Sequence, residues 1–360
     1  MRALFITPMK HLDDPVPSGD RTIARATEHL LKRAGFEVTR ASQYVSFLAA
    51  PDASRMDAIE DEAKRECERL VATAAKPDLI FTYHCYYKAP DLMGPRLAAH
   101  YGVPYVIAEA SHAAKRAQGP WARWHEQAER AIRSANLLLA TSEHDRAGLL
   151  QCRDQSCIAD WPPFIDDTLW PEMPRWSHRG STHFLAVAMM REGDKSESYR
   201  ILASALHLLE RSDWHLTLVG DGPARENILA LFAPFGERVA WRGQIEGMAL
   251  ADAYADADCL VWPAVNEALG MVFLEAALQA CPAIAGDEGG VKALVRSGET
   301  GLLVPPRDPQ AFAAAMDALM AHPSRLEALS EGARTMAEQA TLDAAALRLH
   351  KALVPFSLTL

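Results

Sequence analysis

The sequence has no uninterrupted apolar run long enough to cross a membrane. A spanning helix needs about 20 consecutive apolar residues, and no run of even about 18 occurs in this chain of 360 residues. The first ten residues, MRALFITPMK, lack the apolar core and cleavage site of a secretory signal peptide. With 49% apolar and 23% charged residues, the chain has the composition of a soluble globular protein, which we expect in the cytoplasm.

Cysteine is scarce, and its spacing fits neither disulfide-rich nor zinc-binding domains. The six cysteines form no CxxC pair and no paired zinc-ligand spacing, so we expect free thiols, no metal site and no cofactor. The net charge of −10 argues against general nucleic-acid binding. Internal repeats and low-complexity segments are also missing.

Apolar strand patterns alternate with helical patterns along the chain, and its length suits two domains. This alternation predicts two α/β, doubly wound domains with parallel sheets. Strands are expected at residues 2–7, 36–40, 79–84, 105–110 and 137–141, and again at 183–188, 215–219, 239–242, 259–262, 283–285 and 302–304. Helices are expected at 21–34, capped by Gly35, and at 199–210, 309–320 and 341–353.

Residues 160–180 are the candidate linker, because four prolines interrupt regular structure there: Pro162, Pro163, Pro171 and Pro174. We therefore expect a first domain at residues 1–170, a second at 171–340 and a C-terminal helix within 341–360. Two doubly wound domains joined in this way predict a cleft between the carboxyl ends of their sheets.

Two glutamates flank the start of an apolar helix expected at residues 272–280. Glu267 lies in the loop before it and Glu275 inside it, with Gly270 between them. Amides of Leu269 and Gly270 would lie near the helix N-terminus, where free N–H groups attract anions. This combination is typical of a nucleotide-sugar pocket, although Glu267 could also be an ordinary loop acid and Glu275 a solvated one.

The second half resembles the nucleotide-binding half of retaining family-4 glycosyltransferases, which have the GT-B fold of two Rossmann-like domains facing a cleft. The matching segments stand in the right order and cover most of residues 183–320. They are LTLVGDGPARENI (216–228), VAWRGQI (239–245), ADAYADADCLVWPAVNEALGMVFLEAALQACPAIAGDEGG (251–290) and SGETGLLVPPRDPQAFAAAM (297–316). Residues 1–170 match only loosely.

The resemblance implies roles for several residues. Glu275 would bind the ribose hydroxyls and Glu267 the hydroxyls of the donor sugar. Arg191 and Lys195 would stabilise the departing diphosphate, although the family usually has a Gly-Arg pair and a Lys-Gly pair where this chain has Met190–Arg191 and Lys195–Ser196. Gln244 and Ile245 match the region that contacts the base.

Three further positions are weaker candidates. Gly220 follows a strand and is either a nucleotide-binding turn or a plain strand-to-helix turn. Gly19, in Ser18–Gly19–Asp20, would let a phosphate or sugar approach the backbone, although the family often has two adjacent glycines there. His112 follows a buried strand and resembles the family's histidine near the donor sugar, and His84 has a similar place; either could instead be a packing residue.

Two other segments invite functional interpretations. Asp256 and Asp258 form a DxD pair, but they lie inside the family-4 match, so we do not expect a metal there. The basic stretch at residues 115–133, from Lys115 to Arg133, contains Trp121 and Trp124 and could touch an anionic membrane surface or an anionic acceptor. A solvated helix face with two packed tryptophans is the favoured alternative.

The sequence thus predicts a retaining glycosyltransferase of the hexosyltransferase type. It would move a sugar from a nucleotide-diphosphate sugar, its donor substrate, to the hydroxyl of an acceptor that the sequence does not identify. A nucleotide-sugar hydrolase or epimerase of the same fold and a non-catalytic GT-B-like accessory subunit remain as alternatives. The nucleotide base, the sugar, the linkage and the oligomeric state are not readable from the residues.

Overall fold

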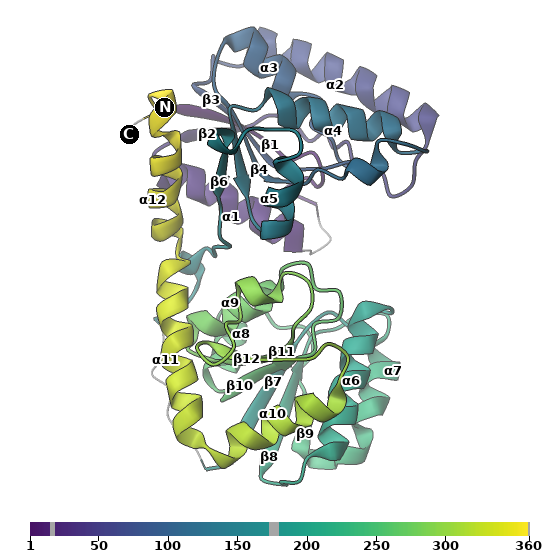
Figure 1. Ribbon diagram of the computed structural model, residues 1–360, viewed down its shortest axis with the longest axis vertical. Helices are drawn as coiled ribbons and strands as arrows, with labels where there is room; N and C mark the ends of the chain where they lie inside the picture. Colours follow the sequence, from purple (N-terminus) through teal and green to yellow (C-terminus); the bar gives the residue numbers. More distant parts are fainter. Residues whose placement is uncertain (15–18, 173–179, 359–360) are drawn as a thin grey trace. The chain divides into compact units, whose positions relative to one another are not determined.

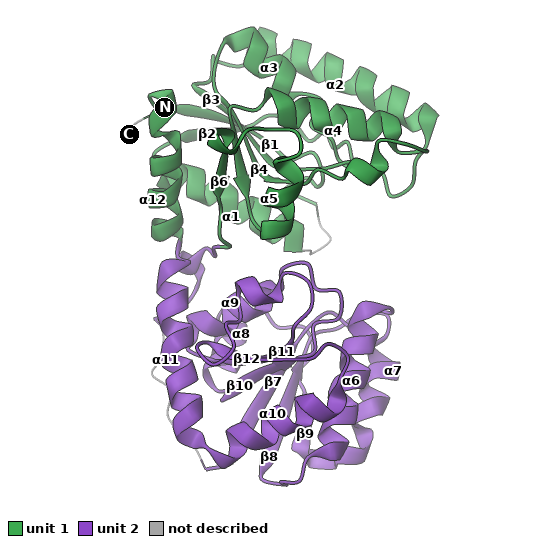
Figure 2. Cartoon of the chain, viewed as in Figure 1, with its two compact units in different colours: residues 1–163, 342–360 green, residues 164–341 purple. Residues whose placement is uncertain are grey.

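The chain divides into two compact α/β units (Figure 2). A computed structural model describes residues 1–14, 19–172 and 180–358. Unit 1 comprises Met1–Pro163 and Leu342–Leu360, and unit 2 comprises Phe164–Thr341. The boundary expected after residue 170 therefore falls inside unit 2. Ser18 and Pro174, named above, lie outside the described residues.

Unit 1 is built on a six-stranded parallel sheet with the order β2-β1-β3-β4-β5-β6 (Figure 1). Its strands are β1 (Arg2–Ile6), β2 (Glu37–Arg40), β3 (Leu79–Cys85), β4 (Tyr105–Ala110), β5 (Leu137–Ala140) and β6 (Ile158–Asp160). Its helices are α1 (Gly19–Arg33), α2 (Ala53–Thr73), α3 (Gly94–Tyr101), α4 (Ala122–Ser134), α5 (Glu143–Leu149) and α12 (Leu342–Leu353).

Unit 2 has a second six-stranded parallel sheet with the order β12-β11-β10-β7-β8-β9. Its strands are β7 (Thr182–Val187), β8 (Trp214–Val219), β9 (Val239–Trp241), β10 (Cys259–Trp262), β11 (Ala283–Gly286) and β12 (Gly301–Val304). Its helices are α6 (Asp194–Leu208), α7 (Arg225–Phe232), α8 (Met248–Ala255), α9 (Met271–Leu278), α10 (Pro309–Ala321) and α11 (Pro323–Gln339).

The sequence pattern explains why these sheets are parallel and covered on both faces. The central strands are continuous apolar runs: β5 reads LLLA and β10 reads CLVW, and every residue of both is buried. A strand buried on both faces suits a sheet flanked by helices. Right-handed crossovers then place α6 and α7 on one face of the unit 2 sheet and α8 and α9 on the other, in agreement with their packing in pairs.

Most predicted strands are confirmed, and the doubly wound fold class with them. The predicted strands 105–110 and 259–262 coincide with β4 and β10, and each of the other predicted strands differs from the observed one by a single residue at one or both ends. Strand β6 was not predicted, because its three residues border the proline-rich segment. Gly35 ends α1 with φ +83°, the left-handed conformation that favours glycine at a helix end.

The last helix belongs to unit 1, although it follows unit 2 in the sequence. Helix α12 packs against α1 and buries Leu342, Leu349 and Leu353, while Arg33 of α1 pairs with Asp343. Both charged side chains are more than half exposed, so this pair adds little stability and the apolar contact carries the attachment.

Within the basic stretch 115–133, both tryptophans are buried and an arginine is ion-paired. Trp124 is fully buried and donates its indole N–H to the carbonyl of Ser46 at 3.2 Å, and Trp121 is 8% exposed. Arg123 pairs with Asp57 and Glu60. The tryptophans are therefore packing residues, as the favoured alternative expected, and are not available to insert into a membrane.

The six cysteines are free thiols, as the sequence predicts. None of the helices in the described ranges is long and apolar enough to cross a membrane.

Candidate nucleotide-sugar site

Loops that follow β7 and β10 meet at one edge of the unit 2 sheet. These two strands are neighbours, but the chain leaves β7 toward β8 on one side and leaves β10 toward β11 on the other. Such a reversal opens a crevice at the carboxyl ends of the strands, where open α/β sheets bind ligands. Most residues predicted to bind the donor lie on these loops and on the helices α6 and α9 that follow them, whereas Gln244 and Ile245 follow β9.

Lys195 and Glu267 form an ion pair across this switch point. The Lys195 ammonium, in the first turn of α6, donates a hydrogen bond to Oε2 of Glu267 in the β10–α9 loop. It also lies 5.5 Å from the centre of the Trp262 ring. The two charged side chains are only 27% and 18% exposed. The structure thus brings together two predicted site residues that are 72 positions apart in the sequence.

The β10–α9 loop is also held by two hydrogen bonds that the sequence analysis did not predict. Val265 N–H donates to the Ser198 hydroxyl at 3.0 Å, and the Asn266 side-chain amide donates to Asp194 Oδ1 at 2.9 Å. Ala264 and Asn266 adopt positive φ, +57° and +49°. Such left-handed conformations are unfavourable for alanine and persist only where surrounding contacts impose them. The loop is therefore a fixed support for Glu267.

Gly270 sets the start of α9 and the room beside Glu267. It has φ +78°, and a Cβ there would lie 2.8 Å from the Phe273 ring and 3.1 Å from Glu267 Cγ. The first N–H groups of the helix have no acceptor within it, so amides at Leu269, Gly270 and the first turn can hold an anion. Arg191, on the β7–α6 loop, is exposed at the same edge of the sheet.

Glu275 is held inside α9 by a partner on the next helix. Its Oε2 accepts a hydrogen bond from the Tyr254 hydroxyl of α8 at 2.9 Å. Burial raises the pKa of Glu275, and the hydrogen bond from Tyr254 acts in the opposite direction. This contact could not be predicted from the sequence, because Tyr254 is 21 positions away on another helix. The contact orients the carboxylate while leaving its other oxygen for a ligand.

Two adjacent glycines after β11 pack against the backbone of the Glu267 loop. A Cβ on Gly289 would lie 2.0 Å from the Glu267 carbonyl oxygen, and one on Gly290 would lie 2.0 Å from that of Ala268. Gly290 N–H also donates to the Glu267 carbonyl at 3.1 Å. The two glycines end the segment DEGG at residues 287–290, and no role was predicted for them from the sequence.

Gly220 has a structural reason to be glycine. Its φ is +135°, and a Cβ there would lie 1.9 Å from the Ala188 carbonyl oxygen. Its N–H donates to the Gly243 carbonyl at 2.8 Å. Gly220 thus joins the β7–α6 loop to the segment with Gln244 and Ile245. Gln244 is exposed, with its side-chain amide 2.8 Å from Glu246, and Ile245 is half-buried.

Asp258, the second aspartate of the DxD pair, has a structural role. Asp258 is buried, and its carboxylate accepts the N–H of His183 at 2.8 Å, which fixes the start of β7 beside β10. A structural bond of this kind accounts for the aspartate without a metal ion.

Unit 1 gathers a second set of predicted positions at the carboxyl ends of β1, β3 and β4. Gly19 is the first residue of α1, with open space around it. Next to it, Asp20 lies 3.5 Å from His84 Nδ1, which is 4.0 Å from Glu109. His84 and Glu109 adopt φ of +66° and +59°. Strain at the ends of two neighbouring strands marks this cluster as a candidate ligand-binding region.

Opposing effects act on the titrating groups of this cluster. Burial alone would lower the pKa of His84, but the carboxylates of Asp20, Glu109 and Asp145 outweigh it and raise this pKa. The contact with His84 lowers the pKa of Asp20, whereas burial raises that of Glu109. The ionised pair of His84 and Asp20 is therefore favoured in the folded protein.

His112 lies in the loop after β4, three residues beyond Glu109 of the His84 cluster. Its carbonyl oxygen would be 2.8 Å from a Cβ on Gly148, so α5 packs closely on this loop. Its imidazole is 5.1 Å from that of His125 on α4. Burial, and then the charge of His125, lower the pKa of His112, which favours the neutral ring.

Replacing Gly220 by alanine should destabilise the protein by about 2 kcal/mol or more, since a backbone oxygen occupies the Cβ position. Gly298→Ala is the matched control: its φ is +85° but nothing lies within 4 Å, so only the strain of about 1 kcal/mol applies. Urea unfolding followed by tryptophan fluorescence measures both. Equal losses in the two variants would contradict the close packing at Gly220.

The His84 cluster should make stability depend on pH. A histidine whose pKa is raised by folding stabilises the folded state fully below its unfolded pKa of 6.5, and this contribution is lost as the pH rises through the folded value. His84→Asn removes the titration and tolerates the left-handed backbone. The stability advantage of the wild type should therefore shrink above about pH 6.5 in urea unfolding at several pH values. A difference that stays constant with pH would show that His84 is not ion-paired.

Residues 181–322 match the family described as Glycosyl transferases group 1. A D-inositol 3-phosphate glycosyltransferase from Thermobispora bispora is 36% identical over an alignment of 168 residues that covers 43% of this chain and 39% of that protein. The chain thus spans less than half the length of the curated relatives that it matches.

Solved structures resemble the whole chain in fold. A sucrose-phosphate synthase from Thermosynechococcus elongatus has a TM-score of 0.71 at 20% identity and covers 99% of both chains. Anabaena Alr3699/HepE, crystallised in complex with UDP, has a TM-score of 0.71 at 16% identity and covers 99% of this chain and 100% of its own. The two doubly wound units therefore have the GT-B fold, and the segment 181–322, which contains the predicted donor residues of unit 2, has the sequence pattern of the group 1 glycosyl transferases.

Proposed function

We propose that the protein is a retaining glycosyltransferase that moves a hexose from a nucleoside diphosphate sugar to an acceptor hydroxyl. The observation that carries this proposal is the pairing of Lys195 with Glu267 beside the free N–H groups of α9. One edge of the sheet thereby offers a cation, amides and two carboxylates, Glu267 and Glu275. The match of residues 181–322 to the group 1 glycosyl transferases supports the same assignment.

The diphosphate is the part of the donor whose charge grows as the sugar leaves. In this proposal Lys195, Arg191 and the amides of Leu269 and Gly270 surround that charge. Fixed donors of this kind stabilise a departing oxyanion more in the transition state than in the bound substrate. The UDP in the crystallised Alr3699/HepE structure supports a nucleoside diphosphate as the leaving group.

The two glutamates take the hydroxyls of the donor. Glu275 accepts the ribose hydroxyls, since Tyr254 already occupies one of its oxygens and fixes its orientation. Glu267 accepts hydroxyls of the sugar with the oxygen that Lys195 leaves free. Gln244 and Ile245 contact the base. No side chain is assigned as the general base; the leaving phosphate takes the proton of the acceptor hydroxyl.

The acceptor side is assigned to unit 1. His112 is a candidate for binding the sugar on the family resemblance alone. Gly19 and the cluster of Asp20, His84 and Glu109 supply polar groups for an acceptor hydroxyl. The burial of both tryptophans argues against peripheral membrane contact through residues 115–133.

Product analysis separates transfer from the alternatives. A hydrolase or epimerase of this fold would convert the nucleotide sugar without an acceptor, and an accessory subunit would bind no nucleotide. A panel of nucleotide sugars is first screened by thermal shift to find the donor that the protein binds. If the protein is a transferase, it should consume this donor only when an acceptor is present.

Replacing Glu275 by alanine should weaken binding of UDP or GDP, whichever the wild type binds, by about 10- to 100-fold. One or two hydrogen bonds to a charged group are lost, each worth about 1.5–3 kcal/mol. Isothermal titration calorimetry measures the affinity. Glu327→Ala, an exposed glutamate on α11, is the control. Unchanged nucleotide affinity in Glu275→Ala would count against the donor site.

Replacing Lys195 by alanine should lower turnover by about 100-fold or more with the fold intact, because the diphosphate loses its fixed cation. The rate of sugar transfer at saturating donor is the measurement, and circular dichroism checks the fold. Lys292→Ala removes an exposed lysine of the same unit and should leave turnover unchanged. A variant at Lys195 that keeps the wild-type rate would refute the proposed role.

A further inference from the structure

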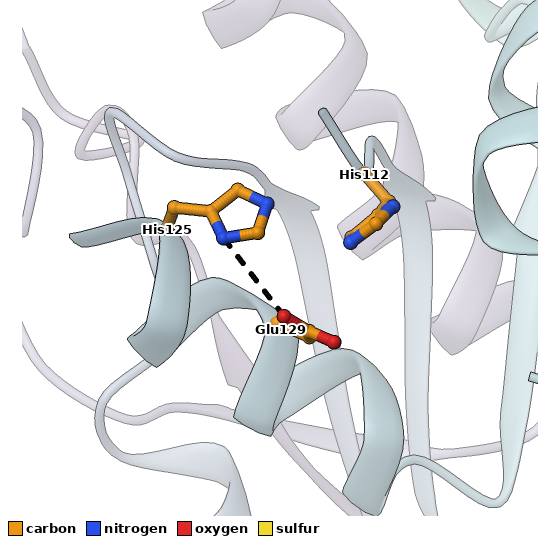
Figure 3. A group of neighbouring side chains, drawn as sticks. All are labelled: His112, His125 and Glu129. Atoms are coloured by element: carbon orange, nitrogen blue, oxygen red, sulfur yellow. Dashed lines mark ion pairs between the residues drawn. The ribbon is translucent and has the colours of Figure 1, made fainter. Parts of the chain in front are cut away.

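Three side chains of unit 1 with metal-binding chemistry lie together beside the middle of α4 (Figure 3). His125 and Glu129 are four positions apart on this helix and so share one face. His112 reaches them from the loop after β4. One nitrogen or oxygen atom from each of the three lies within 4.8 Å of the others. Figure 3 shows the two rings and the carboxylate turned toward one another.

Both imidazoles carry a buried nitrogen that has no hydrogen-bond partner among the described residues. The atoms are His125 Nε2 and His112 Nδ1. His125 is only 4% exposed, so water reaches its ring poorly. A buried polar atom without a partner costs about 1–3 kcal/mol and is uncommon in folded proteins. Two such atoms in one group of three residues leave two ring nitrogens available to a ligand.

The carboxylate of the group faces the histidines with one oxygen. Glu129 Oε1 accepts hydrogen bonds from Arg133 Nε at 2.9 Å and Nη2 at 2.6 Å. Glu129 Oε2 lies 3.9 Å from His125 Nδ1, too far for a hydrogen bond. Arg133 therefore orients the carboxylate from one side and leaves Oε2 for a ligand on the other.

We propose that His112, His125 and Glu129 form a binding site for a divalent transition metal ion, with zinc as the first candidate. Two imidazoles and one carboxylate are a ligand set of zinc sites that keep an open fourth position. Ligand atoms around tetrahedral zinc lie about 3.4 Å apart, so side-chain shifts of roughly 1 Å close the group on the ion. Magnesium and calcium prefer oxygen ligands and suit this site poorly.

The sequence held one signal for this site. The spacing H-x-x-x-E at His125 and Glu129 puts two ligands on one helix face, but the third ligand comes from another element. The arrangement contains neither a cysteine pair nor a DxD motif, which are the metal-binding patterns considered in the sequence.

The test is metal binding by the full chain without a histidine tag, after treatment with a chelator. Equilibrium dialysis against zinc, with elemental analysis, should give one ion per chain. Cobalt should bind in place of zinc, with visible absorption bands typical of tetrahedral nitrogen and oxygen ligands, and magnesium should not displace it. Glu129→Gln and His125→Gln should each weaken zinc binding about tenfold or more, in the range seen when metal-site residues are altered.

Matched controls lie next to the site. Glu126→Gln changes an exposed glutamate on the same helix that pairs with Arg130, and His144→Gln changes an exposed histidine on α5. Both should bind zinc like the wild type. His125 is buried, so circular dichroism checks the fold of each variant; Glu129 is 27% exposed, and Glu129→Gln keeps the test valid should His125→Gln unfold.

Zinc affinity unchanged in Glu129→Gln would overturn the proposal, as would a thiolate-to-cobalt charge-transfer band, which would assign the metal to a cysteine. Absence of stoichiometric binding by the wild type would overturn it as well. None of these measurements uses a sugar donor, so their outcome is independent of the proposed transferase activity.

Discussion

The ion pair between Lys195 and Glu267 is the interaction on which the candidate donor site depends. An exposed pair of this kind contributes little to stability, and a partly buried pair offsets much of its attraction by loss of hydration. Its importance therefore lies in position: it connects the first turn of α6 to the loop before α9. The hydrogen bonds of Ser198 and Asp194 to the same loop add to this connection, so the carboxylate of Glu267 is held in one position.

This constraint follows from the topology of the parallel sheet. Because β7 and β10 are neighbours whose connections leave in opposite directions, a crevice opens at the carboxyl ends of these strands, where their loops and the following helix N-termini come together. Glycines allow the loops to approach each other: Gly220 lies against the loop after β7, and Gly289 and Gly290 lie against the backbone of the Glu267 loop. The positive φ of Ala264, which is unfavourable for alanine, is maintained by the hydrogen bonds of this loop to Ser198 and Asp194.

The sequence predicted what depends on local pattern and missed what depends on distant contacts. Apolar runs such as CLVW located the buried strands, because burial on both faces leaves a continuous signal. Gly270 and Glu275 were predicted from the segment 251–290, which resembles the family. The contacts of Tyr254 and Ser198 and the pairing of Lys195 with Glu267 join different elements, so the spacing of residues along the chain does not reveal them. The group of His112, His125 and Glu129 was missed for the same reason. The domain boundary was expected after residue 170, but the two units divide between Pro163 and Phe164. The prolines indicate an irregular segment without showing where in it the boundary lies.

The central claim is that Lys195, Glu267, Glu275 and the first amides of α9 surround one nucleoside diphosphate sugar. A crystal structure with bound nucleoside diphosphate sugar tests it most directly. The account predicts diphosphate oxygens within hydrogen-bond distance of Lys195 Nζ and of the amides at Leu269 and Gly270, with a ribose hydroxyl on Glu275. A ligand bound elsewhere, with both glutamates turned to solvent and far from it, would contradict the account.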